Sequence, residues 1–234
     1  MLEERPLGPF DVADILLGAI DARLRLRGLA AGADRDRGAV MSQRIGGWAA
    51  ILGGLAWLLV LLGSATGSGE GGPLAGILLI AASLLVLFAL TGLSAFQARR
   101  YPRLVWAAFA LPALGGAAST LGVLVHAAIG DEPFLFGLSA WYLWMTGVLT
   151  MMAGSALFAA ATWRVRALSR AAAAALFVGS VLVVPAVFGM TGLAPIPGEL
   201  AILAAMLVFA GGWIAIGISA LRAGRHMPIG AVVP

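Results

Sequence analysis

The charged residues divide the chain into long apolar intervals. No Asp, Glu or Arg occurs within six successive intervals: Arg44–Glu70, Glu70–Arg99, Arg103–Asp131, Glu132–Arg164, Arg170–Glu199 and Glu199–Arg222. Each interval contains an apolar run of about 20 residues, which as a helix crosses a hydrocarbon core of about 30 Å. The sequence therefore predicts an all-α integral membrane bundle of six transmembrane helices, at about 45–65, 73–96, 104–128, 136–162, 171–192 and 200–221. Membrane barrels instead need shorter segments of alternating polarity.

Composition agrees with a membrane protein and excludes several other classes. Hydrophobic residues make up 61% of the chain and charged residues 11%, whereas soluble domains average about 25% charged residues. The absence of cysteine excludes disulfides and thiolate-ligated metals. All 15 cationic residues are Arg, so Schiff-base chemistry, which needs a lysine amine, is also excluded. The combination of Arg, Ala, Gly and Leu indicates a high-GC bacterial genome and hence the bacterial plasma membrane.

The loops between the predicted helices alternate in charge. Arginines occupy the segments 97–103 and 164–170 and the stretch after the sixth helix, whereas the other loops contain only Glu70, Asp131, Glu132 and Glu199. Cytoplasmic loops of membrane proteins are enriched in Arg and Lys, so both termini are expected in the cytoplasm. The pI of 10.9 is then an orientation signal and does not predict nucleic-acid binding. The expected partners are the lipid bilayer and either other membrane subunits or further copies of the chain.

The even-numbered helices end in similar sequences. The segment from Gly92 to Arg100 resembles the segment from Gly217 to Arg225, and a looser copy begins at Gly154. This pattern predicts three repeated helical hairpins, although chance matches are common in chains rich in Ala, Leu and Gly. Small residues let membrane helices approach closely. The glycine-rich faces of the first, third and sixth helices are therefore expected to point into the bundle.

The chain has three predicted parts. Residues 1–40 form a cytoplasmic N-terminal extension, in which Phe10–Leu29 can form an amphipathic helix followed by a linker. Three interpretations of this extension are open. It is an interfacial helix on the inner membrane surface or a docking helix for a partner. Alternatively it is no part of the natural protein, since Met41 is a plausible start. Residues 41–225 form the transmembrane domain, and residues 226–234 form a short C-terminal tail.

One group of residues suggests a ligand site near the outer surface. It comprises His126, Asp131, Glu132, Trp141 and Tyr142. A histidine beside carboxylates and aromatic rings can bind a cation or the polar head of a cofactor. The alternative is an interfacial aromatic belt, with His126 reaching the headgroup water. No catalytic residue, metal site or cofactor is predicted.

Three functions are compatible with these features. The leading hypothesis is a non-enzymatic membrane component that binds a partner subunit or a small apolar ligand between its helices. Six spans and an amphipathic N-terminal helix also resemble the permease half of some ATP-driven exporters and the substrate-binding subunit of vitamin importers, which implies a transporter subunit. The inner loops are too short for a large coupling helix, which departs from that pattern. The third hypothesis is a membrane enzyme that acts on lipid or isoprenoid at the outer face.

Overall fold

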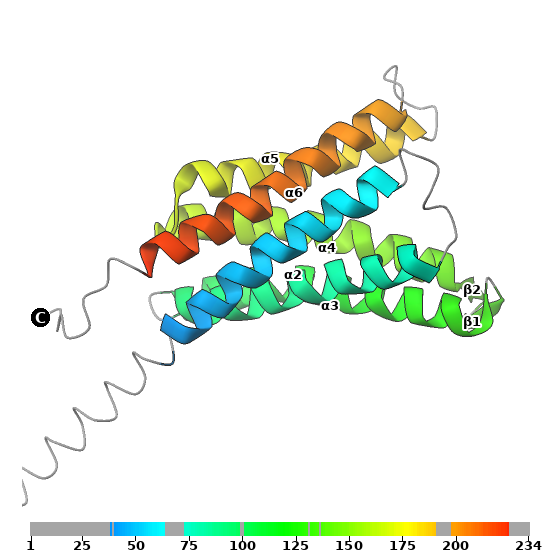
Figure 1. The fold of residues 1–234 in the computed structure, drawn as a ribbon, viewed down its shortest axis with the longest axis horizontal. Coiled ribbons are helices and arrows are strands. Elements are labelled where there is room, and N and C mark those ends of the chain that lie inside the picture. Colours follow the sequence, from blue (N-terminus) through cyan, green and yellow to red (C-terminus); the bar gives the residue numbers. More distant parts are fainter. Residues whose placement is uncertain are drawn as a thin grey trace, which may run out of the picture. The chain divides into compact units, whose positions relative to one another are not determined.

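The computed structural model of the chain describes residues 38, 40–63, 73–98, 101–130, 132–135, 137–190 and 198–224. Six helices run through these residues (Figure 1): Val40–Gly63, α2 (Pro73–Gln97), α3 (Pro102–Ile129), α4 (Ala140–Val165), α5 (Arg170–Met190) and α6 (Gly198–Ala223). A small antiparallel pair, β1 (Pro133–Leu135) and β2 (Leu138–Ser139), joins α3 to α4. The residues 1–41 and 42–234 form two separate units. The helix bundle belongs to the second unit.

The helical prediction is confirmed at the level of a membrane-compatible bundle. Five helices are long and apolar enough to cross a bilayer: the first helix, α2, α3, α4 and α6. The fourth helix begins later than predicted, at Ala140, because the preceding residues form the β1–β2 hairpin. Gly137 has a φ of +78° in the hairpin turn, a backbone conformation that suits glycine. The all-α class is confirmed for the described residues, with this short two-stranded hairpin as an addition that the sequence did not predict.

Glycines bring α3 and α4 into backbone contact. A Cβ added at Gly115 would meet the backbone of Met151, and one at Gly122 would meet the backbone of Trp144. From the other side, a Cβ at Gly147 would meet Ser119, and a Cβ at Gly154 would meet Pro112. As the position on α3 rises, its partner on α4 falls, so the helices are antiparallel. Contact of this kind supplies the packing energy that lipid solvent cannot supply.

The first helix lies between α2 and α6 and contacts each through different glycines (Figure 1). A Cβ at Gly46 would lie 2.9 Å from the backbone nitrogen of Leu93 in α2, whereas one at Gly47 would lie 3.2 Å from the carbonyl oxygen of Gly217 in α6. Two turns later, Gly53 faces α2 and Gly54 faces α6 in the same way. Adjacent glycines point about 100° apart on a helix, so one Gly-Gly pair serves two neighbours.

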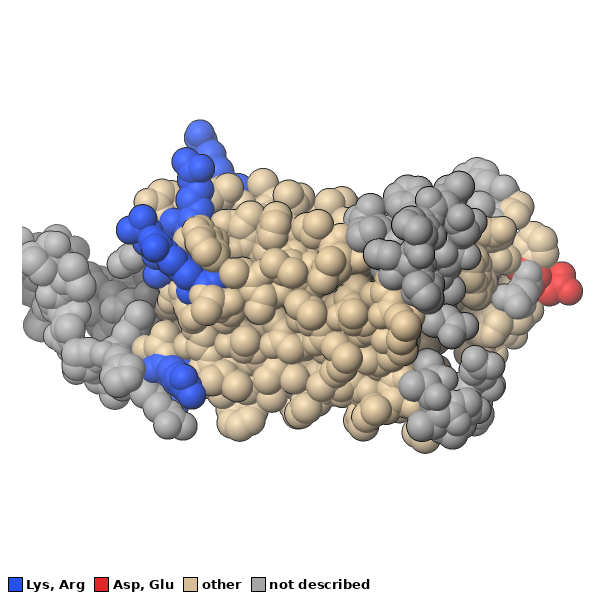
Figure 2. Space-filling model, turned by 90° about the horizontal axis from the view of Figure 1, so that it is seen from above, with Lys and Arg blue, Asp and Glu red and all other residues tan. Residues whose placement is uncertain are grey.

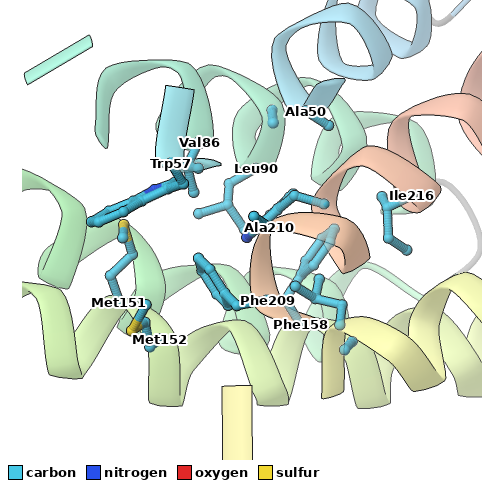
Figure 3. Packing of buried hydrophobic residues seen from close by; sticks show 14 of the residues in the cluster. Ala50, Trp57, Val86, Leu90, Met151, Met152, Phe158, Phe209, Ala210 and Ile216 are labelled. Carbon is cyan, nitrogen blue, oxygen red and sulfur yellow. The ribbon is translucent and has the colours of Figure 1, made fainter. Parts of the chain in front are cut away.

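The interior is filled by large apolar side chains from several helices (Figure 3). Trp57, Phe158, Phe209 and Trp213 are at most 2% exposed, and Figure 3 shows the first three among the buried residues between the helices. The rings of Phe158 and Trp213 stack with centroids 5.8 Å apart, and Phe209 meets Trp213 edge-on. The glycines of the predicted small-residue faces approach neighbouring helices, with one exception. Gly211 has open space where its Cβ would be.

The described arginines gather at one end of the bundle, which we call the arginine end. They lie at or close to helix termini: Arg44, Arg103, Arg164, Arg166, Arg170 and Arg222. Glu132 follows the other end of α3. Figure 2 shows blue Arg atoms at one end and red acidic atoms at the opposite end, with uncharged residues between them. The antiparallel helix pairs therefore place the charges of the described residues as the alternating loops predict.

Candidate functional site

The predicted outer site lies at the end opposite the arginines. His126 belongs to the last turn of α3 and is exposed, and its carbonyl oxygen accepts a hydrogen bond from the N–H of Gly130 at 2.8 Å. Glu132 is exposed just beyond α3, whereas Asp131 lies outside the described residues.

The aromatic members of this predicted site begin α4. Trp141 and Tyr142 are 46% and 58% exposed, and their rings meet edge-on with centroids 5.3 Å apart. The structure thus places them, like His126, on the surface where α3 ends and α4 begins. Such exposure is what an interfacial aromatic belt requires. A ligand site centred on His126 stays a prediction.

A second candidate site, which sequence reasoning missed, is an open groove at the arginine end. The groove has a volume of about 680 Å³ and lies between the beginning of α3 and the end of α4. Its walls are mostly apolar, and they come from these residues: Leu104, Ala107, Ala108, Leu157, Ala160, Ala161 and Trp163. We call this feature the α3–α4 groove.

Alanines create the α3–α4 groove. Ala107 on α3 and Ala160 on α4 are exposed and line it, while Ala108 and Ala161 are buried beneath. A methyl side chain leaves open the volume that a leucine would fill at the same helix positions. Leu157 and Trp163 flank the alanines and are about half exposed. The result is a shallow apolar channel on the outer surface of the bundle.

Three arginines lie at the mouth of the groove: Arg164, Arg166 and Arg170, all exposed. Arg164 is in the last turn of α4, Arg166 follows that helix, and Arg170 begins α5. Arg166 has a φ of 56°, in the left-handed region, and its backbone N–H donates to the carbonyl oxygen of Thr162 at 3.1 Å. Glycine or asparagine usually occupies this position after a helix. The chain carries a guanidinium here despite the backbone cost.

Hydrogen bonds between helices hold the segment that carries these arginines. The side-chain amide of Gln97, at the end of α2, exchanges two hydrogen bonds with the Thr162 hydroxyl on α4, at 3.1 and 3.2 Å. The backbone N–H of Ser169 donates to the Ser219 hydroxyl on α6 at 2.7 Å. Gln97 and Thr162 are fully or almost fully buried, where a hydrogen bond is costly to lose. Hydrogen bonds to α2 and α6 therefore fix both ends of the α4–α5 connection, which carries the three arginines.

A further hydrogen bond joins the first helix to α6 at the same end. The Gln43 side chain donates to the carbonyl oxygen of Ala220 at 2.7 Å. Within the described ranges, His, Asp and Glu form no group of three that could hold a metal ion.

Adjacent alanines near the two arginine clusters were the available signal for the groove. The sequence alone did not indicate the groove, because the pairing of 107–108 with 160–161 depends on how α3 meets α4. The comparisons add no assignment. No protein family matches the chain, and neither does any curated protein or any solved structure.

Proposed function

We propose that the chain is a six-span membrane protein of the bacterial plasma membrane, with the arginine end in the cytoplasm and a binding role without catalysis. The observation that carries the proposal is the separation of charge between the two ends of the described bundle (Figure 2). Arginine at one end is the usual mark of the cytoplasmic side. The predicted cytoplasmic position of both termini agrees with this orientation.

The proposal of six spans requires that α5 also crosses the membrane. The other five helices satisfy length and hydropathy criteria on their described residues, whereas the apolar stretch described for α5 is shorter, Arg170–Val183. The helix itself has 21 residues, Arg170–Met190, which corresponds to about 31 Å of helix. That length matches a hydrocarbon core of about 30 Å. A spanning α5 also keeps the end of α6 on the same side as Arg44.

The bound molecule is proposed to be a small apolar or amphipathic ligand in the α3–α4 groove. The α3–α4 groove is an open hollow of about 680 Å³ with three arginines in its lining. Small-molecule sites are concave and largely apolar, with a few polar groups that fix orientation. The α3–α4 groove has this composition. The alternative occupant of the α3–α4 groove is a side chain inserted by a partner subunit.

Cysteine labelling tests the topology. Because the chain has no cysteine, each single-Cys variant carries one thiol. A membrane-impermeant maleimide should label Glu132→Cys and Ala194→Cys in intact cells. Ala167→Cys should be labelled only after the cells are permeabilised.

Two outcomes would contradict the proposal. Labelling of Ala167→Cys, but not Glu132→Cys, in intact cells would reverse the orientation. Protection of Ala194→Cys in intact cells, with labelling after permeabilisation, would show that α5 does not cross the bilayer.

A further inference from the structure

We infer that the α3–α4 groove binds one anionic phospholipid, with its phosphate at Arg164, Arg166 and Arg170 and the upper part of an acyl chain in the apolar channel. The inference rests on the proposed membrane location and names the class of ligand for the proposed binding site. It follows from the charge at the mouth, the shape of the channel and the backbone conformation of Arg166.

The charge at the mouth has no counterpart among the described side chains. Glu132, the acidic residue whose side chain the structure describes, lies at the opposite end of the bundle (Figure 2). Three exposed guanidinium groups within one short segment therefore favour an anionic partner. Arginine matches phosphate oxygens with two parallel hydrogen bonds, which makes it suited to a phospholipid headgroup.

The apolar channel offers a contact surface for an acyl chain, which a free phosphate lacks. From Arg164 the α4 wall extends to Leu157, two helical turns or about 10 Å towards the centre of the bundle. Small Ala160 and Ala107 line this stretch, with Leu104 and Trp163 beside them. An amphipathic molecule satisfies both parts of the site at once. In a membrane, the abundant molecule with a phosphate next to a hydrocarbon chain is a phospholipid.

The conformation of Arg166 is the third observation. A left-handed φ of 56° is unfavourable for a residue with a side chain, and glycine avoids the cost. Backbone strain of this kind concentrates at binding sites, where the surrounding structure maintains it. Here the strained residue carries one of the three guanidinium groups, and its N–H is fixed on Thr162. The residue in this conformation is thus also one of the three cationic residues that line the groove.

Arginines on the cytoplasmic side also determine the orientation of a membrane protein. The experiment therefore needs a control variant that lacks arginines outside the groove. Arg44 on the first helix and Arg222 on α6 are exposed at the same end but do not line the groove. They contribute to the same surface charge. A variant that lacks both arginines therefore reports the general attraction of anionic lipid to this end.

The test uses the full chain purified in a neutral detergent and titrated with phosphatidylglycerol, with bound lipids counted by native mass spectrometry. One phosphatidylglycerol should bind at least about tenfold more tightly than phosphatidylcholine. The triple variant R164Q/R166Q/R170Q should lose about 100-fold in affinity, since each lost hydrogen-bonded contact between a guanidinium and the lipid phosphate costs about fivefold or more. The control R44Q/R222Q should change affinity less than about twofold. Equal losses in the two variants would overturn the inference.

A second variant tests the channel without altering charge. Ala160→Phe fills the apolar stretch at an exposed position, so folding should be kept, as circular dichroism can verify. Phosphatidylglycerol affinity should fall about tenfold, while the weak binding of glycerol 3-phosphate should stay unchanged. If Ala160→Phe has no effect, or glycerol 3-phosphate binds as tightly as the lipid, the site takes a free anion and the inference fails.

The two proposals fail in different ways. Cysteine labelling that gives six spans, together with arginine variants that bind lipid normally, would remove the lipid site and leave the membrane topology. Labelling that reverses the orientation, together with the expected loss in R164Q/R166Q/R170Q, would keep the groove as a lipid site and overturn the proposed function.

Discussion

Substitution of Gly147 by alanine tests whether backbone contact holds α3 against α4. The added Cβ would lie 2.7 Å from the Cα of Ser119 and 2.8 Å from the carbonyl carbon of Ala118. Carbon atoms in comfortable contact are about 3.5–4.0 Å apart. Because the obstructing atoms are backbone, the two helices must separate locally by about 1 Å.

The expected cost follows from that separation. A radial gap of 0.5–1 Å forfeits about a quarter to a half of the dispersion energy of the facing atoms, and overpacking costs about 1–3 kcal/mol in measured cases. Alanine also favours the helix over glycine by up to about 1 kcal/mol, which offsets part of the loss. Gly211→Ala is the matched control, because nothing lies within 4 Å of its Cβ position. The difference between the two variants therefore reports the steric cost alone, about 1–3 kcal/mol.

The assay is reversible unfolding of the purified protein by SDS in mixed micelles, followed by helical circular dichroism. Gly147→Ala should unfold at a lower SDS mole fraction than the unaltered protein, whereas Gly211→Ala should unfold at the same or a higher one. If the two variants have equal free energies of unfolding within about 0.5 kcal/mol, close approach at Gly147 does not stabilise the bundle and the reasoning is refuted.

Three further predictions concern polar residues. A double-mutant cycle of Gln97→Leu and Thr162→Val, measured by the same unfolding assay, should give a coupling energy of about 0.6 kcal/mol or more, and a value near zero would contradict the buried hydrogen-bond pair. Arg166→Gly should raise the free energy of unfolding by up to about 1 kcal/mol, because glycine adopts a left-handed φ without steric cost. A lower stability of this variant would show that the Arg166 side chain stabilises the fold. His126→Ala should abolish ligand binding at the predicted outer site and keep the fold, whereas His226→Ala, outside the described residues, should leave binding unchanged. Identical binding by the two histidine variants would remove the outer site.

The Gln97–Thr162 cycle and the His126 substitution test different properties at opposite ends of the bundle, stability at one end and ligand binding at the other. Gln97 and Thr162 lie at the arginine end and are buried, so their substitution affects stability first. His126 is exposed, and a substitution there should leave the free energy of unfolding nearly unchanged. A large destabilisation by His126→Ala would show that the residue supports the end of α3.

The helices could be predicted from the sequence because membrane insertion depends on each segment separately. About 20 apolar residues without charge favour a spanning helix whatever the neighbours are. The predicted ranges therefore fall close to the observed ones, such as 73–96 against Pro73–Gln97 for α2. The main departure is α4, where the turn at Gly137 and the pairing of two short strands replace the expected first turn. Cross-strand pairing is a contact between segments, which helical hydropathy does not detect.

Helix pairing and the α3–α4 groove were decided by the tertiary structure, because both depend on two surfaces meeting. The sequence indicated that glycines face the interior, but it did not show that Gly46 contacts α2 while the adjacent Gly47 contacts α6. It placed arginines at 164–170, but the apolar channel beside them exists only because Ala107 and Ala160 come together. Hydropathy is a property of one segment, whereas close packing and hollows are properties of a pair, so only the folded bundle specifies them.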